Sequence, residues 1–202
     1  AGTVIKSSGE VKIMGINIDD LPKKARSLIG IVPQEITFDS FFPLEQTLEF
    51  AAGYYGIKPH LRKTEEILKA LSLWDKRHVL PRKLSGGMKR RFQIAKALVH
   101  DPNIIILDEP TAGVDVELRH ELWDYFRDLH KKGKTILLTT HYIEEAEMLC
   151  DKVAIIDKGR VIKEGTPKEL TRQLGKAGIT INVSDPGKEL ESCLKDFTYT
   201  QD

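Results

Sequence analysis

The chain has 202 residues, the length of one compact α/β domain with at most a short appendage. Hydrophobic residues make up 41% of it and charged residues 30%, which excludes a disordered or fibrous protein. The 31 basic and 30 acidic residues leave a formal charge of +1, so no overall field indicates a nucleic-acid partner.

The cysteines and the apolar runs indicate in which cellular compartment the protein is expected. Cys150 and Cys193 lie outside any Cys-x-x-Cys or histidine-rich spacing, which disfavours a disulfide framework or a zinc site and favours a reducing cytosol. The longest apolar runs, such as 104–107 and 136–138, are far shorter than the ~20 residues that span a bilayer. We therefore expect no membrane-spanning segment, and no secretory signal at the start of the chain.

The first part of the chain predicts strands followed by a helical insertion. Residues 9–18 have a strand pattern with Gly15 at a turn, and residues 27–32 form an apolar strand candidate. From residue 36 to residue 83 the apolar spacing becomes helical. Two amphipathic helices are marked there by Leu44, Leu48, Ala51 and Tyr55, and by Ile67, Leu68, Leu71 and Trp74.

The middle of the chain predicts a parallel βαβ unit. Residues 103–109 are too apolar on both faces for a half-exposed strand and fit a central parallel strand. Residues 135–141 repeat that pattern, and residues 153–157 repeat it once more. Between the first two strands, residues 117–132 predict a helix that ends at Gly133. The apolar face of this helix consists of Leu118, Leu122, Phe126 and Leu129.

The last part of the chain predicts a hairpin and an appendage. Residues 158–160 form a hairpin turn into Val161, residues 168–174 a short helix, and residues 179–183 an alternating strand. We expect residues 166–202 to form a C-terminal appendage.

Asp108 and Glu109 are the first candidates for chemistry. They follow a wholly apolar strand, at the edge where open α/β sheets bind their ligands. Oxygen ligands of this kind suit Mg²⁺, and consecutive side chains of a strand point opposite ways, so that one carboxylate can face a metal while the other orients a water. The alternative is a strand that merely enters a charged loop, but the turn at residues 110–113 favours a functional site.

Ser85, Gly86 and Gly87 precede a helix predicted over residues 88–99. A Ser-Gly-Gly element at a helix N-terminus exposes backbone N–H groups that can bind an anion. An ordinary N-cap with a flexible lead-in is the alternative. The basic run at residues 89–91 is expected to be a solvated face of this helix.

Gln34 and His141 each follow an apolar strand. The amide oxygen of Gln34 could ligate a metal or a water, and His141 could reach a phosphate or an attacking water. A plain loop glutamine and a structural histidine are the alternatives.

In chain order these elements resemble the motifs of the ATP-binding-cassette (ABC) ATPases. Gln34 resembles the Q-loop, residues 84–87 the signature motif, and residues 104–110 the Walker B strand with its catalytic glutamate. Residues 112–115 resemble the D-loop and His141 the H-loop.

The resemblance covers nearly all of residues 1–170 and is strongest to the exporter branch, including multidrug-type exporters. It implies a P-loop NTPase-like α/β fold, a mostly parallel sheet flanked by helices with a helical subdomain at about residues 36–100. The ABC ATPase domain would occupy residues 1–165, and the appendage residues 166–202.

The resemblance also implies a role for each motif residue. Asp108 would hold Mg²⁺ through water, Glu109 would polarise the attacking water, and His141 would contact the γ-phosphate. Gln34 would contact the metal and signal to the membrane domain. Three residues, Ser85, Gly86 and Gly87, would bind ATP held by a second subunit in a head-to-tail dimer, and Asp115 would link the two sites.

The implied cofactors are ATP and Mg²⁺. The implied partners are a second nucleotide-binding subunit and transmembrane permease subunits, with no nucleic acid. The protein would be cytoplasmic and peripheral on the inner face of the cell membrane. Four residues, Phe38, Phe41, Phe42 and Pro43, fall where the family docks a helix of its membrane partner, with core aromatics as the alternative.

The family's phosphate loop, G-x-x-x-x-G-K-[ST], does not occur in the 202 residues. Residues 133–135 read Gly-Lys-Thr, but Asp128 stands where the loop needs its first glycine, and the tripeptide lies between a helix and a strand. We expect the missing loop to lie upstream and the 202-residue chain alone to be inactive as an ATPase. A non-catalytic fragment or regulatory module, or a soluble non-transport ABC ATPase, remain alternatives.

Overall fold

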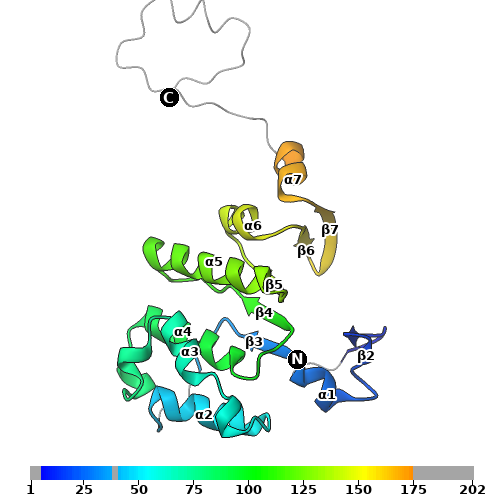
Figure 1. Cartoon of the computed structure of the whole chain (residues 1–202). Helices are drawn as coiled ribbons and strands as arrows, with labels where there is room; N and C mark the ends of the chain where they lie inside the picture. Colours follow the sequence, from blue (N-terminus) through cyan, green and yellow to red (C-terminus); the bar gives the residue numbers. More distant parts are fainter. Residues whose placement is uncertain (1–5, 38–40, 175–202) are drawn as a thin grey trace, which may run out of the picture. The chain divides into compact units, whose positions relative to one another are not determined.

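The structure is a computed structural model that describes residues 6–37 and 41–174 (Figure 1). The chain divides into two compact units, residues 1–151 and residues 152–202. The boundary near residue 165 that the sequence suggests stays a prediction.

A three-stranded parallel sheet forms the centre of the first unit. Its strands are β3 (Ile29–Val32), β4 (Ile104–Asp108) and β5 (Thr135–Thr139), in the order β3-β4-β5. The register aligns Val32 with Leu107 and Leu107 with Leu138. Because all three strands run the same way, their carboxyl ends meet at one edge of the sheet. The predicted parallel βαβ unit is confirmed.

The N-terminal segment forms a hairpin in place of a longer strand. It consists of β1 (Lys12–Ile13) and β2 (Ile16–Asn17), which pair antiparallel, and α1 (Pro22–Ser27) follows. The turn needs left-handed backbone at Met14 and Gly15, whose φ angles are 49° and 79°.

The predicted helical insertion is confirmed for the described residues. It contains α2 (Leu44–Tyr54), α3 (Thr64–Ala70) and three 3₁₀ turns, η1 (Pro59–Leu61), η2 (Trp74–Lys76) and η3 (Pro81–Lys83). The helix α4 (Gly86–Leu98) then leads back to β4.

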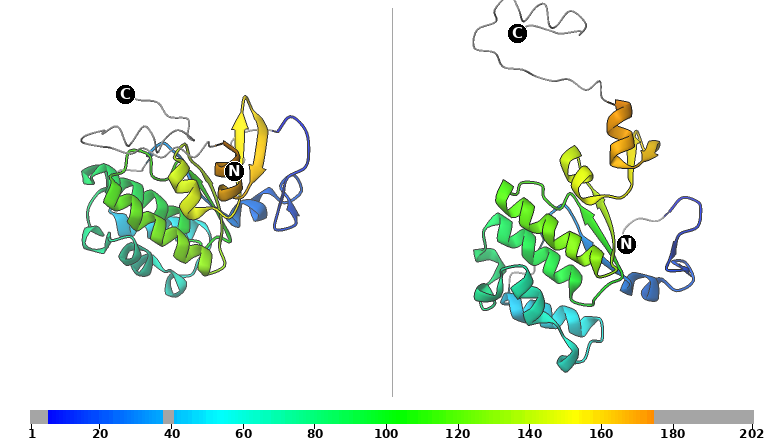
Figure 2. Two further views of the ribbon diagram at one scale, coloured as in Figure 1. Left: turned by 90° about the horizontal axis from the view of Figure 1, so that it is seen from above. Right: turned by 45° about the horizontal axis from the view of Figure 1, so that its top comes forward.

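One longer helix and a short one complete the first unit. The helix between β4 and β5 is α5 (Val116–Lys131), and Figure 2 shows it side by side with α4, to which it is tied by an Arg91–Glu121 ion pair of 3.5 Å. The short helix α6 (Ile143–Leu149) follows β5.

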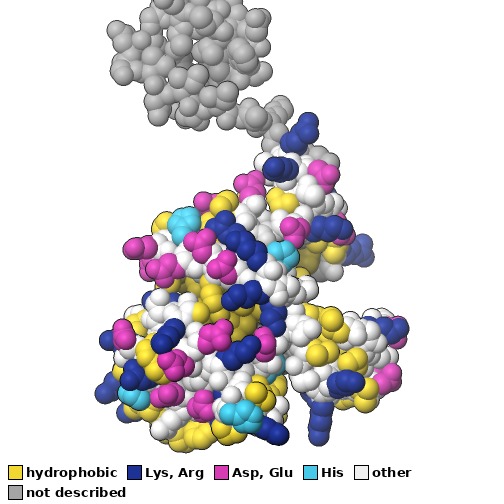
Figure 3. All heavy atoms as spheres, viewed as in Figure 1, with side chains coloured by type: hydrophobic (Ala, Val, Ile, Leu, Met, Phe, Trp, Pro, Cys, Tyr) yellow, Lys and Arg dark blue, Asp and Glu magenta, His cyan; other side chains and the backbone are white. Residues whose placement is uncertain are grey.

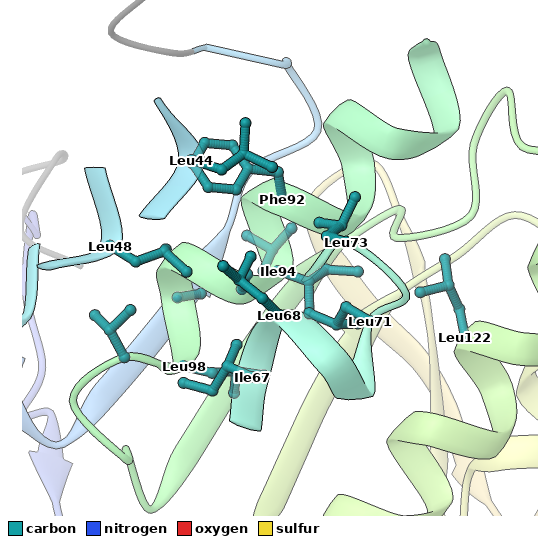
Figure 4. Packing of buried hydrophobic residues seen from close by; sticks show 14 of the residues in the cluster. Leu44, Leu48, Ile67, Leu68, Leu71, Leu73, Phe92, Ile94, Leu98 and Leu122 are labelled. Atoms are coloured by element: carbon teal, nitrogen blue, oxygen red, sulfur yellow. The ribbon is translucent and has the colours of Figure 1, made fainter. Parts of the chain in front are cut away.

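The main core lies between the helical insertion, α4, α5 and one face of the sheet. Figure 4 shows Phe92 together with leucines and isoleucines of this core. The fully or nearly fully buried members include Leu44, Leu48, Leu68, Leu73, Phe92, Ile94, Ile105, Leu107, Leu122 and Phe126. Most of the apolar residues predicted to mark α2, α3 and α5 therefore lie in one core.

The second unit contains β6 (Val153–Asp157), β7 (Arg160–Gly165) and α7 (Pro167–Leu174). The predicted hairpin turn at residues 158–160 is confirmed. The prediction that residues 153–157 repeat the pattern of the central parallel strands is wrong, because β6 pairs antiparallel with β7. An apolar run cannot by itself distinguish the two pairings. The strand expected at residues 179–183 lies outside the described residues.

Surface and length observations agree with the composition. On the face drawn in Figure 3, acidic and basic side chains are interspersed over the first unit. Within residues 6–37 and 41–174, every helix is too short or too polar to cross a bilayer.

Candidate functional site

Four predicted residues lie at the carboxyl edge of the parallel sheet. Gln34 follows β3, Asp108 ends β4, Glu109 comes next, and His141 follows β5. We call these four residues the carboxylate edge. Their proximity is a consequence of parallel pairing, which brings together loops that are far apart in sequence.

Glu109 is the centre of the carboxylate edge. Nε2 of Gln34 donates a hydrogen bond of 3.2 Å to Oε2 of Glu109. Nδ1 of His141 lies 3.2 Å from the other carboxylate oxygen, Oε1. The Glu109 side chain is 26% exposed and that of His141 57%, so both can be reached from solvent.

Asp108 and the backbone of Glu109 are both held by Thr139 at the end of β5. The Thr139 hydroxyl donates a short hydrogen bond to Oδ1 of Asp108. The backbone N–H of Glu109 points to Oγ1 and to the carbonyl oxygen of Thr139, each at 3.1 Å. Glu109 has a φ of 46°, a left-handed conformation that is uncommon for a residue other than glycine and marks functional sites.

Arg90 is a buried residue of α4 that the predicted solvated face did not account for. The expectation that residues 89–91 form a solvated face is wrong for Arg90, which is only 3% exposed. Its guanidinium points from α4 to the loops after β3 and β4. Its acceptors are the backbone carbonyl oxygens of Pro33, Gln34, Asp108, Glu109 and Pro110 and the side-chain oxygen of Gln93.

A helical-wheel argument could have found Arg90. It lies four residues before Ile94 and seven before Ala97, both buried, and therefore on the buried face of α4. Gln93 lies on the same face, and its Nε2 donates a 2.7 Å hydrogen bond to the carbonyl of Glu35. The pKa of Arg90 is lowered by burial, against which the negative charges of Asp108, Glu145 and Glu109 act.

The signature residues form a second group at the start of α4. Ser85 is the N-cap, and its Oγ accepts a hydrogen bond of 3.3 Å from the backbone N–H of Met88. A Cβ at Gly87 would lie 2.4 Å from Cδ2 of Leu118, so a larger residue there would require the Leu118 side chain to move. A Cβ at Gly86 would meet no atom within 4 Å.

Asp115 lies beside these residues. It is the N-cap of α5, and its Oδ1 accepts a 2.9 Å hydrogen bond from the backbone N–H of Leu118. A polar surface hollow of about 440 Å³, which we call the signature hollow, joins the two helix starts. It is lined by Ser85, Gly87, Met88, Arg91, Asp115, Glu117, Leu118 and Glu121. The eight predicted site residues thus form two groups, the carboxylate edge and the start of α4 with Asp115.

Glu145 is a further buried acid that the sequence did not single out as a site residue. It is fully buried in α6, and its Oε1 accepts hydrogen bonds from Thr111 Oγ1 at 2.9 Å and from Trp123 Nε1 at 3.0 Å. Thr111 follows Glu109 by two residues. Glu145 therefore ties the turn after the carboxylate edge to α5 and α6.

The carboxylate edge has donor chemistry that suits a magnesium ion bound with a phosphate substrate. Mg²⁺ is usually held by one or two carboxylates and completes its shell with water and phosphate oxygens. Asp108 is exposed at the edge, and Gln34, whose Nε2 faces Glu109, has its Oε1 as the remaining polar atom of the amide. No cluster of three or more His, Cys, Asp or Glu side chains able to hold a metal occurs among the described residues. Asp108 and Gln34 therefore fit a metal ion whose other ligands are water and the phosphate oxygens of a substrate.

Comparison with known proteins decides the family. The model of the family described as "ABC transporter" matches residues 1–112, more than half of the chain. The chain belongs to the ABC transporter family. The order of motifs that the sequence analysis compared with ABC ATPases is thereby accounted for.

Two curated relatives are ATP-binding proteins. The chain is 39% identical over 198 residues to a Nod factor export ATP-binding protein I of Rhizobium etli, and 39% over 188 residues to one of Burkholderia pseudomallei. These alignments cover 96% and 92% of this chain but 62% of each relative. The chain thus spans about three fifths of the length of these relatives.

Two solved structures are similar in fold. One is titled as the ATP binding subunit of an ABC transporter, with a TM-score of 0.77 and 29% identity over 96% of this chain and 79% of that chain. The other is cbiO1 from Clostridium perfringens, part of the ABC transporter complex cbiONQ. Its TM-score is 0.74 at 31% identity, covering 86% of this chain and 72% of that chain. The predicted ABC ATPase fold is confirmed.

Proposed function

We propose that this chain is part of the ATP-binding and ATP-hydrolysing subunit of an ABC exporter. The observation that carries the proposal is the contact of Glu109 with both Gln34 and His141 at the carboxyl edge of the sheet. The names of the relatives, Nod factor export ATP-binding proteins, support the exporter class.

The geometry suits phosphoryl transfer to water. The reaction asks mainly for positioning and for neutralisation of negative charge. Glu109 has one oxygen toward Gln34 and one toward His141, so its carboxylate is oriented to accept a hydrogen bond from an attacking water and to withdraw its proton. His141, which is exposed, can turn one ring nitrogen to a terminal phosphate while the other faces Glu109.

Asp108 and the amide oxygen of Gln34 would hold the magnesium ion. Bound there with ATP, Mg²⁺ would supply charge neutralisation on the phosphate oxygens. Thr139 keeps the Asp108 carboxylate in place through its hydroxyl.

Replacement of Glu109 tests the catalytic assignment. In the protein at its natural length, we expect Glu109→Gln to lower the ATPase rate by about 10² to 10⁴-fold and to leave ATP binding in place, because general-base catalysis contributes that much. Glu65→Gln, an exposed change in α3 that removes an ion pair with Lys69, is the matched control. An unchanged rate in Glu109→Gln would refute the role of Glu109.

We also propose that the signature hollow acts on ATP held by a second subunit in a head-to-tail dimer. Residues at the starts of α4 and α5 line this hollow, and the exposed Gly86 beside it has open space where a Cβ would lie. Helix N-termini present backbone N–H groups that favour a phosphate. Asp115, in the same hollow, would link the two sites of the dimer. In such a dimer, hydrolysis would need the carboxylate edge of one subunit and the signature hollow of the other.

Mixing two inactive variants tests the dimer. Glu109→Gln damages the carboxylate edge, and Gly86→Arg adds a long charged side chain at the signature motif, where a Cβ meets no atom within 4 Å. In a head-to-tail dimer of one of each, one composite site carries both defects and the other carries none, so mixing should restore activity. If each protomer hydrolyses ATP with its own two groups, the mixture stays inactive.

A patch of exposed aromatic side chains supports the proposal of a membrane partner. It consists of Phe41, Phe42, Phe50 and Tyr54, which are 84%, 41%, 57% and 89% exposed. Phe42 packs edge-to-face on Phe50 at 4.9 Å. The core alternative is wrong for Phe41 and Phe42, and Phe38 lies outside the described residues.

We propose that this aromatic patch contacts permease subunits and holds the protein on the cytoplasmic face of the cell membrane. Phe50→Ser combined with Tyr54→Ser should lower co-purification with the membrane fraction and leave ATP binding unchanged. Leu61→Ser, which replaces another exposed apolar residue outside the patch, is the control. Equal membrane association of both variants would contradict the docking proposal.

A further inference from the structure

Arg90 joins the helix of the signature motif to the loops of the carboxylate edge. It lies four residues after Gly86, the first residue of α4, and its side chain is buried. Its six hydrogen bonds go to Pro33 O at 2.7 Å, Gln34 O at 3.3 Å, Asp108 O at 2.8 Å, Glu109 O at 2.6 Å, Pro110 O at 2.9 Å and Gln93 Oε1 at 2.8 Å. One side chain therefore spans the loops after two neighbouring strands.

The chemistry of these contacts is that of a clamp on the backbone. All six acceptors are amide oxygens, so the guanidinium is directed at peptide groups and not at a carboxylate. A guanidinium presents five N–H donors in one rigid plane, and hydrogen bonds from a charged donor are stronger than neutral ones. A lysine at this position has three donors on one atom and could not span both loops in the same way.

The backbone of Glu109 is the feature that most requires such a clamp. Its φ of 46° places it in the left-handed region, which disfavours a residue with a Cβ unless the surroundings hold it there. Its N–H is held by Thr139 from β5, and its C=O accepts the 2.6 Å hydrogen bond from Arg90. The two peptide groups of Glu109 are thus fixed from opposite sides, and the carboxylate is left facing Gln34 and His141.

We propose that Arg90 is a positioning residue that sets the orientation of the Glu109 carboxylate for hydrolysis. It acts through the backbone of Glu109 and of the neighbouring loop residues, and it is not assigned a contact with the substrate. The inference rests on the proposed function, because it assigns Arg90 to the same site. It also makes α4 the direct link between the signature hollow and the carboxylate edge.

Kinetics of Arg90 variants in the protein at its natural length test this inference. Arg90→Met should lower kcat by at least about tenfold and change KM for ATP by less than about threefold, because a small misplacement of a catalytic group lowers turnover more than ground-state binding. Arg90→Lys should restore part of kcat. Lys96→Met, which replaces an exposed basic residue of the same helix, should leave kcat unchanged.

A double variant separates positioning from a merely structural role. If Arg90 acts by placing Glu109, then Arg90→Met added to Glu109→Gln should lower the residual rate by less than about twofold, because the positioned carboxylate is already absent. A multiplicative loss in the double variant, or a wild-type kcat in Arg90→Met, would overturn the inference. If Arg90→Met fails to fold, Arg90→Lys is measured in its place. A lowered kcat with little change in KM would support the inference, whereas a changed KM with full kcat would overturn it. Full activity of Glu109→Gln alone would instead reject the proposed function.

Discussion

Trp123 in α5 donates a 3.0 Å hydrogen bond from its indole nitrogen to Oε1 of Glu145 in α6. Glu145 is fully buried. The same oxygen accepts the hydroxyl of Thr111, and Oε2 has no hydrogen-bond partner among the described residues. A buried acid with this arrangement has a structural role that can be measured.

Glu145 should therefore be sensitive to truncation and less sensitive to neutralisation. Glu145→Ala leaves two buried donors without an acceptor and opens a cavity, which should cost about 3 kcal/mol of unfolding free energy. Glu145→Gln retains Oε1 and should cost clearly less. Urea unfolding of the two variants measures the difference, and equal losses would contradict this assignment.

A side chain at Gly30 should lower the stability of the fold. A Cβ there would lie 2.4 Å from the carbonyl oxygen of Ala97 and 2.9 Å from Cγ of Pro102, so β3 and α4 would have to separate. Gly30→Ala should lower the unfolding free energy by about 1 to 3 kcal/mol, as overpacking of a core does. In the control Gly53→Ala the new methyl meets only the flexible end of Arg62, and the change should stay below about 1 kcal/mol. Similar unfolding midpoints for both variants would show that the close approach is absent.

The two glycines of the signature motif should respond differently. Gly87→Ala brings a methyl against Leu118, which is buried, and should destabilise the fold by about 1 kcal/mol. Gly86→Ala has open space and should leave the unfolding midpoint unchanged while it lowers the ATPase rate, if this glycine faces a phosphate. Thermal unfolding and ATPase assays on the same preparations give both readouts. The double variant Gly87→Ala with Leu118→Ala should recover part of the loss from the clash, and strict additivity would argue against it.

His100 should make stability depend on pH. Its ring stacks on Tyr55 at 3.8 Å, its Nε2 lies 3.1 Å from the carbonyl oxygen of Ile29, and its buried Nδ1 has no partner among the described residues. Burial lowers the pKa of His100, the Ile29 carbonyl and the charge of Asp101 act in the opposite direction, and Lys134 adds to the lowering.

The sign of the effect follows from these contacts. Because the folded-state pKa of His100 lies below the value of about 6.5 in an unfolded chain, the unfolded chain takes up a proton first as the pH falls. The contribution of neutral His100 to the unfolding free energy is fully present above about pH 6.5. It is lost as the pH falls through the folded-state pKa. Wild type should therefore lose more unfolding free energy than His100→Gln between pH 7.5 and pH 5.5. A larger loss in the variant would reverse the assigned direction.

The parts of the molecule that are coded locally could be predicted from the sequence. Apolar runs placed β3, β4 and β5, and the 3.6-residue spacing of Leu118, Leu122 and Phe126 placed α5 with its buried face. The order of motifs from Gln34 to His141 also indicated the ABC family, which the match to residues 1–112 establishes. These features depend on residues near one another in the chain or on motif identity.

Only the tertiary structure decided which residues face each other across those elements. The spacing of Arg90 from Ile94 and Ala97 could indicate that it lies on the buried face of its helix. It could not indicate that the guanidinium binds the carbonyls of Asp108 and Glu109, which lie 18 and 19 residues away. The antiparallel pairing of β6 with β7 was equally hidden, because an apolar strand carries no mark of its partner's direction. A short-range pattern records which face of an element is apolar, whereas the acceptors of a buried guanidinium and the neighbour of a strand are set by how distant segments pack.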